Sequence, residues 1–577
     1  MPRLPNLQGG ASTRVVTDAF RGRNHNIRIA DGELYETYNL SADHYPLLST
    51  RRPRGVKATL TNPAGMLEKD ALCYVAGGTL FVNDLATSVT GLSSGEKQLV
   101  SMGAYIVIFP DKRYYNTENP ADSGYLEASW NVTGNVSYAP CDVDGVPYTL
   151  SSTGDTAPAD PAGGDYWLDT GSGSLQQYSE AQGVWTQVET VYTRVSFPTQ
   201  GQLPALFKEG DGVEIAGLDY DLDGTKFLYG VGGESGSEND WIVLIGLAPT
   251  TSSEGIAVSI ERSLPEMDFV VECQNRLWGC FYGRAGGDTV NELYCSALGD
   301  FRNWRQYQGL STDSWAASVG SDGQWTGAVN YLGHPVFFKE NRIHTITVSA
   351  AGAHRVDETV CRGVQRGSHK SLTVVGETLY YKSVTDVCAW QGGFPQSVSG
   401  QLGDAKYRNA VGGAFGAKYY LSMQGEDEAW SLFTYDRGIC YREDELRALC
   451  FAAVGEELWC IDADTCALLA INGTQGETEE ELSWALETGV LSYEYPDKKY
   501  LFRYDIRLVL DGEARISMEY DSSGIWVQSG TIRMHGTGTA VVPVRPRRCD
   551  HLRLRLEGTG PVKIFSIARI LEVGSDV

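Results

Sequence analysis

Residues 269–281 read Phe-Val-Val-Glu-Cys-Gln-Asn-Arg-Leu-Trp-Gly-Cys-Phe, and this pattern decides the fold. A short apolar run, a polar turn and a second run rich in aromatic residues are typical of a β-hairpin. The pattern recurs in residues 71–84, 100–115, 325–346, 372–390, 411–435 and 451–468, which makes seven units. From Trp325 onward the units begin roughly 40 to 47 residues apart, which suits one four-stranded propeller blade per unit.

A β-propeller explains this repetition physically. Each hairpin has one apolar face that it cannot bury alone, and radial stacking of neighbouring hairpins buries the faces while leaving only short edges. Residues 376–381 (Gly-Glu-Thr-Leu-Tyr-Tyr) and 455–460 (Gly-Glu-Glu-Leu-Trp-Cys) show the required alternation. These motifs are too degenerate to identify a propeller family, and a stacked set of ordinary β-sandwiches remains the alternative.

The hairpin rhythm is interrupted between residues 117 and 251. Residues 153–165 combine Gly, Pro, Asp and Thr in the manner of a loop or linker. Short strand patterns nevertheless occur within the interruption, at residues 166–169, 183–188 and 212–215. We therefore expect one or two small inserted β modules that project from the propeller rim, where they are free to touch a partner.

The C-terminal part changes to strict alternation of apolar and polar residues. The apolar positions are first Phe502, Tyr504, Ile506, Leu508 and Leu510, then Ala514, Ile516, Met518 and Tyr520, and finally Leu552, Leu554 and Leu556. A period of two over several strands predicts a sheet with one buried and one solvated face. We expect a jelly-roll-like β-sandwich over residues 482–577.

The predicted fold class is therefore all-β, with a β-propeller-like core, an inserted β module and a C-terminal β-sandwich. The propeller is expected to be discontinuous, over residues 61–116 and 252–475, with the insertion at residues 117–251. Residues 1–60 are expected to form an N-terminal segment that packs on the core.

Charge and hydropathy narrow the classes of function. The formal net charge is −26, from 73 acidic against 47 basic residues, which disfavours a nucleic-acid surface that neutralises phosphates. The same acidity suits a wall past which DNA slides without sticking. No stretch approaches the ~18 apolar residues of a membrane helix, and the first residues lack a secretory signal. We expect synthesis in a cytoplasm and no membrane anchor.

Two patterns bear on metals. The twelve cysteines show no CxxC spacing, which favours buried thiols over a zinc site or a disulfide framework. Asp219, Asp221 and Asp223, followed by Gly224, fit the start of a calcium loop, but Gly230 stands where such a loop needs a bidentate Glu. A polar hairpin turn is the simpler interpretation, so we predict no metal and no cofactor, with these aspartates as a weak alternative.

Catalytic motifs are missing from the sequence. It contains no Gly-x-Ser-x-Gly elbow, no HExxH, no phosphate loop and no dinucleotide fingerprint. Paired carboxylates for glycoside hydrolysis are always available among 73 acidic residues, so they discriminate nothing. The prediction is that the chain is not an enzyme and has no catalytic residue, with a propeller hydrolase as one alternative.

Two arginine clusters stand out in this acidic chain. They consist of Arg51, Arg52 and Arg54 in one cluster and Arg545, Arg547 and Arg548 in the other. The planar guanidinium pairs bidentately with carboxylates and is favoured at interfaces. Both clusters are therefore interface candidates, and solvated turns with ion pairs inside the chain are the alternative.

The insertion also contains aromatic residues suited to stacking on sugar rings. Trp167 and Trp185 lie on two of its predicted strands, and Tyr178 lies in the segment between them. They support an alternative function for the chain, a receptor- or glycan-binding propeller protein of a virion or a cell surface.

Several segments together carry a family resemblance. They are residues 31–34 (Asp-Gly-Glu-Leu), residues 39–55 with Arg-Arg-Pro-Arg-Gly at their end, residues 298–304 (Leu-Gly-Asp-Phe-Arg-Asn-Trp), 312–323, 337–340, 543–552 and 567–576. The combination resembles the tail hub or nozzle proteins of podovirus-type bacteriophages, often described as packaged-DNA stabilisation proteins. The resemblance spans most of the chain apart from residues 116–251.

The resemblance implies a structural role in a virion. Proteins of that family contain a β-propeller and form a ring, usually of six copies, below the portal and adaptor proteins at the head–tail connection. The ring retains packaged DNA, opens for genome ejection and carries tail fibres or a needle at its distal end. The expected partners are therefore further copies of the chain, portal and adaptor proteins, fibre or needle proteins and, transiently, genomic DNA.

Overall fold

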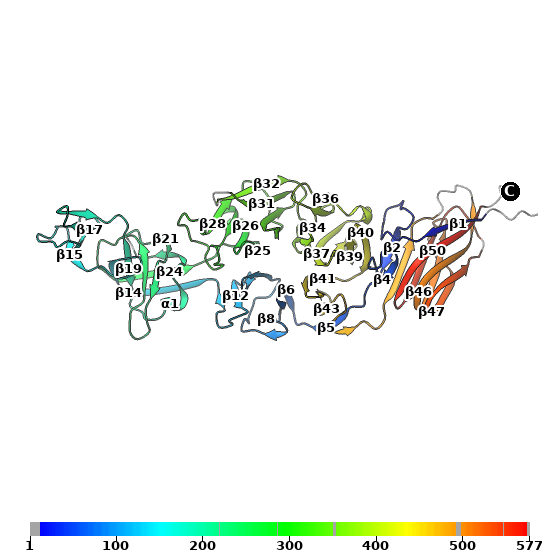
Figure 1. The fold of residues 1–577 in the computed structure, drawn as a ribbon, viewed down its shortest axis with the longest axis horizontal. Helices are drawn as coiled ribbons and strands as arrows, with labels where there is room; N and C mark the ends of the chain where they lie inside the picture. Colours follow the sequence, from blue (N-terminus) through cyan, green and yellow to red (C-terminus); the bar gives the residue numbers. More distant parts are fainter. Residues whose placement is uncertain are drawn as a thin grey trace, which may run out of the picture.

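The fold is that of a computed structural model, which describes residues 12–573 except residues 219, 286, 350–352, 492–497 and 546. In the described chain, helical turns are confined to α1 (Leu203–Leu206), η1 (His369–Ser371) and η2 (Gly400–Leu402). None of these helices has the length and apolar character needed to cross a membrane. The predicted all-β class, with a propeller-like core, an inserted β module and a C-terminal sandwich-like domain, is confirmed. The three parts lie in a row (Figure 1).

Seven antiparallel sheets form the propeller, one for each hairpin unit of the sequence. Blade 1 contains β6 (Pro63–Lys69), β7 (Ala71–Ala76), β8 (Thr79–Val82) and β9 (Leu85–Ala86), and blade 2 contains β10 (Gln98–Met102), β11 (Tyr105–Phe109), β12 (Arg113–Asn116) and β13 (Gly124–Tyr125). Blade 3 contains β25 (Phe269–Glu272), β26 (Leu277–Ala285), β27 (Asp288–Cys295) and β28 (Trp315–Ser318), and blade 4 contains β29 (Gly327–Tyr331), β30 (His334–Lys339), β31 (Arg342–Val348) and β32 (His354–Val360).

The remaining blades follow the same plan. Blade 5 contains β33 (Thr373–Val375), β34 (Thr378–Lys382), β35 (Val387–Trp390) and β36 (Gln396–Ser397), and blade 6 contains β37 (Tyr407–Phe415), β38 (Lys418–Gly425), β39 (Trp430–Asp436) and β40 (Ile439–Asp444). Blade 7 combines β41 (Ala448–Val454), β42 (Glu457–Asp462) and β43 (Ala467–Ala470) with β5 (Gly55–Thr59) and β44 (Glu477–Thr478).

The ring closes on itself through both ends of the propeller sequence. The innermost strand β10 lies beside β6 and β25, β25 lies beside β29, and β37 lies beside β33 and β41. Strand β41 of the last blade in turn lies beside β6 of the first. The N-terminal strand β5 pairs with β43, with Ala58 opposite Leu468, and so joins the last blade to the start of the chain. This pairing holds the ring together without a disulfide.

Apolar side chains fill the space between neighbouring blades. Ile106 and Ile108 of blade 2 pack with Cys73 and Leu80 of blade 1, and a similar cluster joins blades 5 and 6. Nine of the twelve cysteines are buried. Burial raises the pKa of Cys295 to about 11, which keeps that thiol protonated and unreactive at neutral pH.

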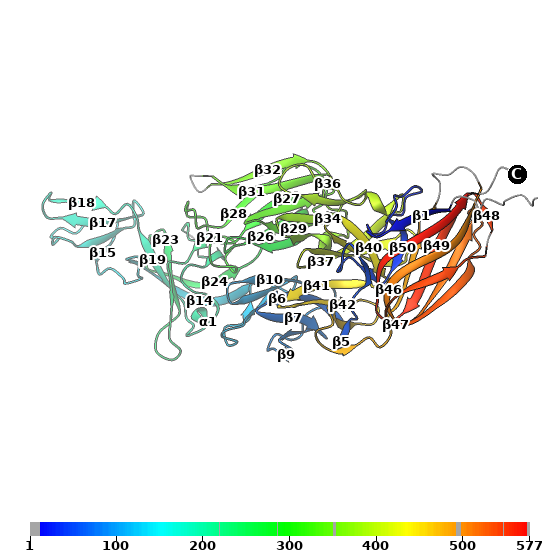
Figure 2. The ribbon, with the colours of Figure 1, turned by 45° about the vertical axis from the view of Figure 1, so that its right-hand side comes forward.

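The insertion consists of two sheets. A seven-stranded sheet has the order β21-β20-β24-β14-β19-β23-β22, and a four-stranded sheet lies beyond it at the tip (Figures 1 and 2). The larger sheet contains β14 (Ala128–Cys141), β19 (Tyr192–Ser196), β20 (Gly212–Ala216), β21 (Gly224–Phe227), β22 (Gly230–Gly232), β23 (Trp241–Ile245) and β24 (Ser252–Arg262). The tip sheet contains β15 (Leu150–Gly154), β16 (Tyr166–Asp169), β17 (Ser174–Ser179) and β18 (Val184–Gln187).

The insertion begins and ends about eleven residues later than the expected residues 117–251. Strand β13 still belongs to blade 2, because Arg113 of β12 pairs with Tyr125. Strands β14 and β24 then run antiparallel from Ala128 opposite Arg262, and leave the propeller together. Both predicted boundaries came too early in the sequence. At the first boundary, β13 is only two residues long and leaves little pattern to recognise, and at the second, β24 continues the insertion sheet beyond Thr251.

A curved ten-stranded sheet forms the C-terminal domain, with the main order β2-β45-β49-β46-β50-β4-β3. Its C-terminal strands are β45 (Ser483–Thr488), β46 (Lys499–Tyr520), β47 (Val527–Pro543), β48 (Arg548–Cys549), β49 (Leu552–Thr559) and β50 (Val562–Val573). The predicted alternation is visible in the core, where Tyr504, Ile506, Leu508 and Leu510 are completely buried. Phe502 is exposed instead, because a bulge between Leu501 and Arg503 shifts the register.

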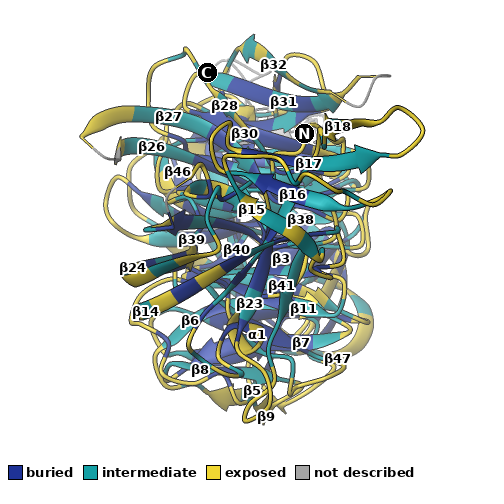
Figure 3. Ribbon diagram, turned by 90° about the vertical axis from the view of Figure 1, so that its left-hand side faces the viewer, coloured by how far each residue is buried: buried dark blue, intermediate teal, exposed yellow. Residues whose placement is uncertain are grey.

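The N-terminal residues are not a separate segment that packs on the core. Strands β1 (Ser12–Thr17), β2 (Leu34–Tyr38), β3 (Leu40–Ser41) and β4 (Leu48–Thr50) belong to the C-terminal sheet, and β5 belongs to the propeller. The reason is pairing between distant residues, since β1 lies along β50 with Ser12 opposite Glu572. Figure 3, seen from the inserted end, shows buried strands inside and exposed residues mainly in peripheral loops.

Candidate functional site

The innermost strands of the seven blades surround a central cavity of about 490 Å³. Every blade contributes lining residues, among them Met66, Gln98, Val270, Ala328, Thr373, Gly412 and Ala452. Gly412 and Gly413 are needed here, because a Cβ on Gly412 would lie 2.8 Å from the Thr373 hydroxyl oxygen. The cavity therefore lies on the propeller axis, where loops and strand ends of all blades converge.

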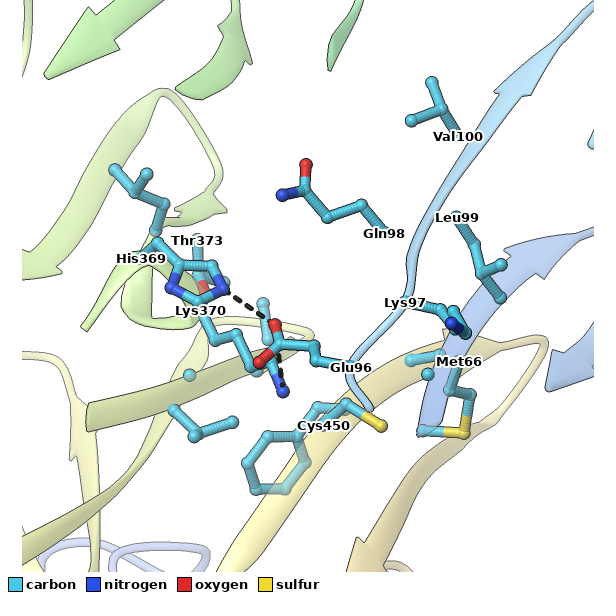
Figure 4. A pocket seen from close by; sticks show the side chains of 18 of the residues that line it. Met66, Glu96, Lys97, Gln98, Leu99, Val100, His369, Lys370, Thr373 and Cys450 are labelled. Atoms are coloured by element: carbon cyan, nitrogen blue, oxygen red, sulfur yellow. Dashed lines mark hydrogen bonds and ion pairs between the residues drawn. The ribbon is translucent and has the colours of Figure 1, made fainter. Parts of the chain in front are cut away.

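Three charged or polar side chains meet across this cavity (Figure 4). Glu96 precedes blade 2, whereas His369 and Lys370 precede blade 5. His369 Nε2 lies 2.8 Å from Glu96 Oε1, and Lys370 Nζ lies 3.2 Å from the same oxygen. Lys370 Nζ also donates to the carbonyl oxygen of Leu449 at 3.0 Å. The group thus ties segments of blades 2, 5 and 7 together across the axis.

The carboxyl group of Glu96 is strongly acidic in this setting. Burial alone would raise its pKa, but the hydrogen bond with His369 and the positive charge of Lys370 outweigh burial and lower the pKa to about 2. Among the described residues, Glu96 is the only carboxylate that lines the cavity. Glycoside hydrolysis requires two carboxyl groups, one of which donates a proton. The cavity lining does not provide this pair.

The structure brings the three predicted aromatic residues together in the tip sheet. Tyr178 of β17 lies directly opposite Trp185 of β18, with ring centroids 5.3 Å apart. Trp167 of β16 contacts Trp185 edge-on at 5.7 Å, and its indole N–H donates to the Gly154 carbonyl oxygen at 3.0 Å. Trp167 is buried, whereas Tyr178 and Trp185 are half-buried. Trp167 therefore supports the two rings that reach the surface.

The first arginine cluster is mostly internal. Arg51 and Arg54 are buried, and Arg54 lies 3.3 Å from Glu443 and 2.6 Å from Asp444. Arg51 pairs with Glu479 at 2.8 Å. These two guanidinium groups are not available for contacts with another molecule, because ion pairs inside the chain occupy them. Arg52 alone of this cluster is exposed.

The second arginine cluster is at the surface. Arg545, Arg547 and Arg548 are exposed, and Arg547 lies over the ring of Tyr520 at 4.9 Å. Arg548 is in β48, at the outer end of the C-terminal sheet (Figure 2). The two clusters predicted as interface candidates therefore do not form one surface.

The weak calcium candidate behaves as a turn. Asp223 accepts backbone N–H groups from Gly217 at 3.1 Å and from Leu218 at 2.7 Å. The carbonyl oxygen of Asp221 accepts from Lys226 Nζ, and Asp219 lies outside the described residues. Among the residues that the structure describes, no group of His, Cys, Asp and Glu is arranged to hold a metal ion.

The sequence did not single out Glu96, His369 and Lys370. A signal was present, because residues 96 and 369–370 stand immediately before hairpin units that begin near residues 100 and 372. In a propeller, the residues that lead into an innermost strand lie close to the axis. Polar residues at these positions were the available indication of a polar centre.

Comparison with known proteins gives no family and no curated relative, since no family model and no curated sequence matches. One similar solved structure is the exo-β-1,3-galactanase of Phanerochaete chrysosporium with galactose, at 7% identity and a TM-score of 0.21, covering 52% of this chain and 94% of that one. Another is the extracellular domain of a putative hybrid two-component system from B. thetaiotaomicron, at 9% identity and a TM-score of 0.18, covering 95% and 98%.

These likenesses correct one prediction. The expectation that the chain is not an enzyme does not stand, because the similar solved structures include a galactanase and a second glycoside hydrolase. With TM-scores near 0.2, the likenesses assign no activity, substrate or site to this chain. The resemblance to bacteriophage tail proteins stays a prediction.

Proposed function

We propose that the chain is a receptor- or glycan-binding propeller protein whose tip sheet, β15–β18, is the recognition surface. The observation that supports this most is the pair Tyr178 and Trp185, two half-buried rings held side by side at the far end of the insertion. Aromatic faces combine a large apolar surface with a fixed orientation. Such a pair offers a stacking platform for the apolar face of a sugar ring.

Polar groups beside the rings suit the hydroxyl groups of a sugar. Gln176 lies directly opposite Gln187, two pairs along from Tyr178 and Trp185, so all four side chains belong to one face. Gln176 Nε2 donates to the hydroxyl of Ser174 at 2.8 Å, which fixes its amide. Ligand sites of this kind combine apolar contact with a few oriented hydrogen-bonding groups.

The test is a substitution of Trp185, one of the two half-buried rings. Glycans that bind the full chain are titrated calorimetrically against Trp185→Ala, for which we expect at least a tenfold loss of affinity, equivalent to about 1.4 kcal/mol. Phe394→Ala is the matched control, because Phe394 is an aromatic residue of blade 5 that is 72% exposed and lies far from the tip in sequence and sheet. Equal affinities of the two variants for every bound glycan are the result that would overturn the proposal.

As a second candidate, we propose a structural component of a bacteriophage tail, a hub or nozzle below portal and adaptor that retains packaged DNA and forms the channel for genome ejection. The exposed Arg52, Arg545, Arg547 and Arg548 support it, because they are basic groups on a chain of net charge −26. Cyclic assemblies use two different patches on each subunit. The cluster of Arg545, Arg547 and Arg548 on one copy and carboxylates on the next copy would satisfy that requirement.

Mass photometry tests this second candidate. The purified chain, alone and mixed with portal and adaptor complexes, is expected to form rings of about six copies. A triple change of Arg545, Arg547 and Arg548 to Ser should prevent ring formation without changing the fold. A chain that stays monomeric and does not bind the adaptor at any concentration would argue against a tail role. The proposed glycan-binding function would not be affected by that result.

A further inference from the structure

A second cavity, of about 340 Å³, lies in the C-terminal domain and belongs to neither site described above. Its floor is the inner face of the curved sheet, where Val15, Arg569 and Tyr504 lie side by side on β1, β50 and β46. Residues 27–34 and 488–491 complete its lining. Phe20, Ile29, Leu554 and Ile567 form apolar parts of the wall, and the charged residues Arg28, Asp31 and Glu33 line it as well.

Two buried polar atoms in this cavity lack a hydrogen-bond partner among the described residues. They are the Tyr504 hydroxyl oxygen and the Arg569 Nε, and both residues are at least nine-tenths buried. A buried donor without a partner costs free energy, and native proteins rarely leave one unpaired. Two such atoms from directly opposite residues on adjacent strands mark a place where a bound hydrogen-bond acceptor would be favourable.

The chemistry of these two atoms determines which kind of ligand group can bind between them. Arg569 Nε only donates, and burial raises the pKa of Tyr504, so its hydroxyl keeps a proton to donate at neutral pH. The other edge of the Arg569 guanidinium is held by Asp31, with Nη1 3.0 Å from Oδ1, and Asp31 also accepts from the Thr17 hydroxyl at 3.0 Å. The hydroxyl group of Thr488, another polar residue of the lining, donates to the Gly489 carbonyl oxygen and accepts from the Leu554 backbone N–H.

We propose that this cavity binds a small apolar carboxylate, whose carboxylate group accepts from Tyr504 and Arg569 and whose hydrocarbon part lies against Phe20, Ile29 and Leu554. The volume is near the lower end of the range for small-molecule sites, roughly 300 to 1,000 Å³, so the ligand is small. The shared chemistry covers a medium-length fatty acid and an aromatic acid. This site is independent of the proposed recognition surface at the tip, which lies at the opposite end of the molecule.

Calorimetric titration of the full chain with decanoate and with 2-naphthoate tests the proposal and distinguishes the two kinds of ligand. We expect one of them to bind in a one-to-one complex, and the uncharged analogue, decanol or 2-naphthol, to bind at least tenfold more weakly. Tyr504→Phe removes only the unpaired hydroxyl and leaves the packing intact, and we expect it to weaken binding about tenfold, in keeping with a hydrogen bond to a charged group.

Tyr435→Phe is the matched control, because Tyr435 is a buried tyrosine of the propeller outside this cavity. It should leave the affinity unchanged. The proposal is overturned if neither acid binds, if the uncharged analogue binds as tightly as the acid, or if Tyr504→Phe binds as tightly as the control. Native mass spectrometry of each variant confirms that it is folded and shows the bound mass directly.

Discussion

At the scale of single residues, the Arg-Arg-Pro-Arg run at residues 51–54 shows what sequence alone cannot supply. The run looks like a surface cluster, yet Arg54 is buried beside Glu443, 389 residues further along the chain. Composition identified the arginines, but only the fold identifies their partners. The aromatic residues Tyr178 and Trp185 were easier to place, because they belong to neighbouring strands of one local hairpin.

Arg54→Met is expected to destabilise the protein by about 3–5 kcal/mol, because it leaves Glu443 and Asp444 buried without their main counter-charge. Urea unfolding followed by tryptophan fluorescence measures the change. Arg52→Met is the control. Because Arg52 is exposed, this variant should change the free energy of unfolding by no more than about 0.5 kcal/mol. Similar losses in both variants would mean that the ion pairs do not stabilise the fold.

The ion pairs that Glu96 makes across the propeller axis predict that the stability of the fold depends on pH. Its pKa is about 2 in the folded protein, against about 4.3 for an ordinary glutamate. A lowered pKa means that the interaction stabilises the fold above pH ~4.3 and is lost as the pH falls from there toward 2. Because the side chain is partly exposed, we expect only about 1 kcal/mol at pH 7.

Glu96→Gln should therefore be less stable than the native chain at pH 7, and the difference should shrink below pH ~4.3. Thermal unfolding between pH 3 and 7 measures it. Glu377→Gln, a change at an exposed glutamate of blade 5, should show no such trend. A difference that is constant with pH would show that the charge of Glu96 is not involved.

At the scale of elements, local hairpins were predictable and distant pairings were not. The seven blades follow from alternation and turn residues inside each unit. Strand β5 was missed because its partners, Leu468 and Leu469 of β43, lie at the far end of the propeller sequence. The bulge between Leu501 and Arg503 was missed for a different reason, since alternation continues through it in the sequence and only the register breaks.

Strand β5 is expected to hold the ring closed. Val56→Pro removes a backbone donor from a strand that pairs with β43 on one side and β44 on the other, which should cost about 1–3 kcal/mol. Val56→Thr keeps the backbone donor and the β-branched shape, and should cost far less because Val56 is 39% exposed. Limited proteolysis and thermal unfolding compare the two. Equal stability would mean that the ring does not depend on this pairing.

At the scale of the whole molecule, the three parts form a row with different chemistry at the two ends (Figures 1 and 2). The tip sheet presents aromatic rings and amides, and the C-terminal sheet presents arginines and holds the second cavity. Between them, Glu96, His369 and Lys370 span the propeller axis. If the chain does serve in a tail, DNA is therefore expected to pass between copies in a ring rather than through one propeller.

Recognition at the tip sheet is the central claim, and a glycan array probed with the full chain tests it most directly. We predict a defined set of bound glycans for the native chain and for Phe394→Ala, and loss of that set for Trp185→Ala. A Trp185→Ala variant that is folded and still binds the same glycans, or a native chain that binds none, would contradict the account.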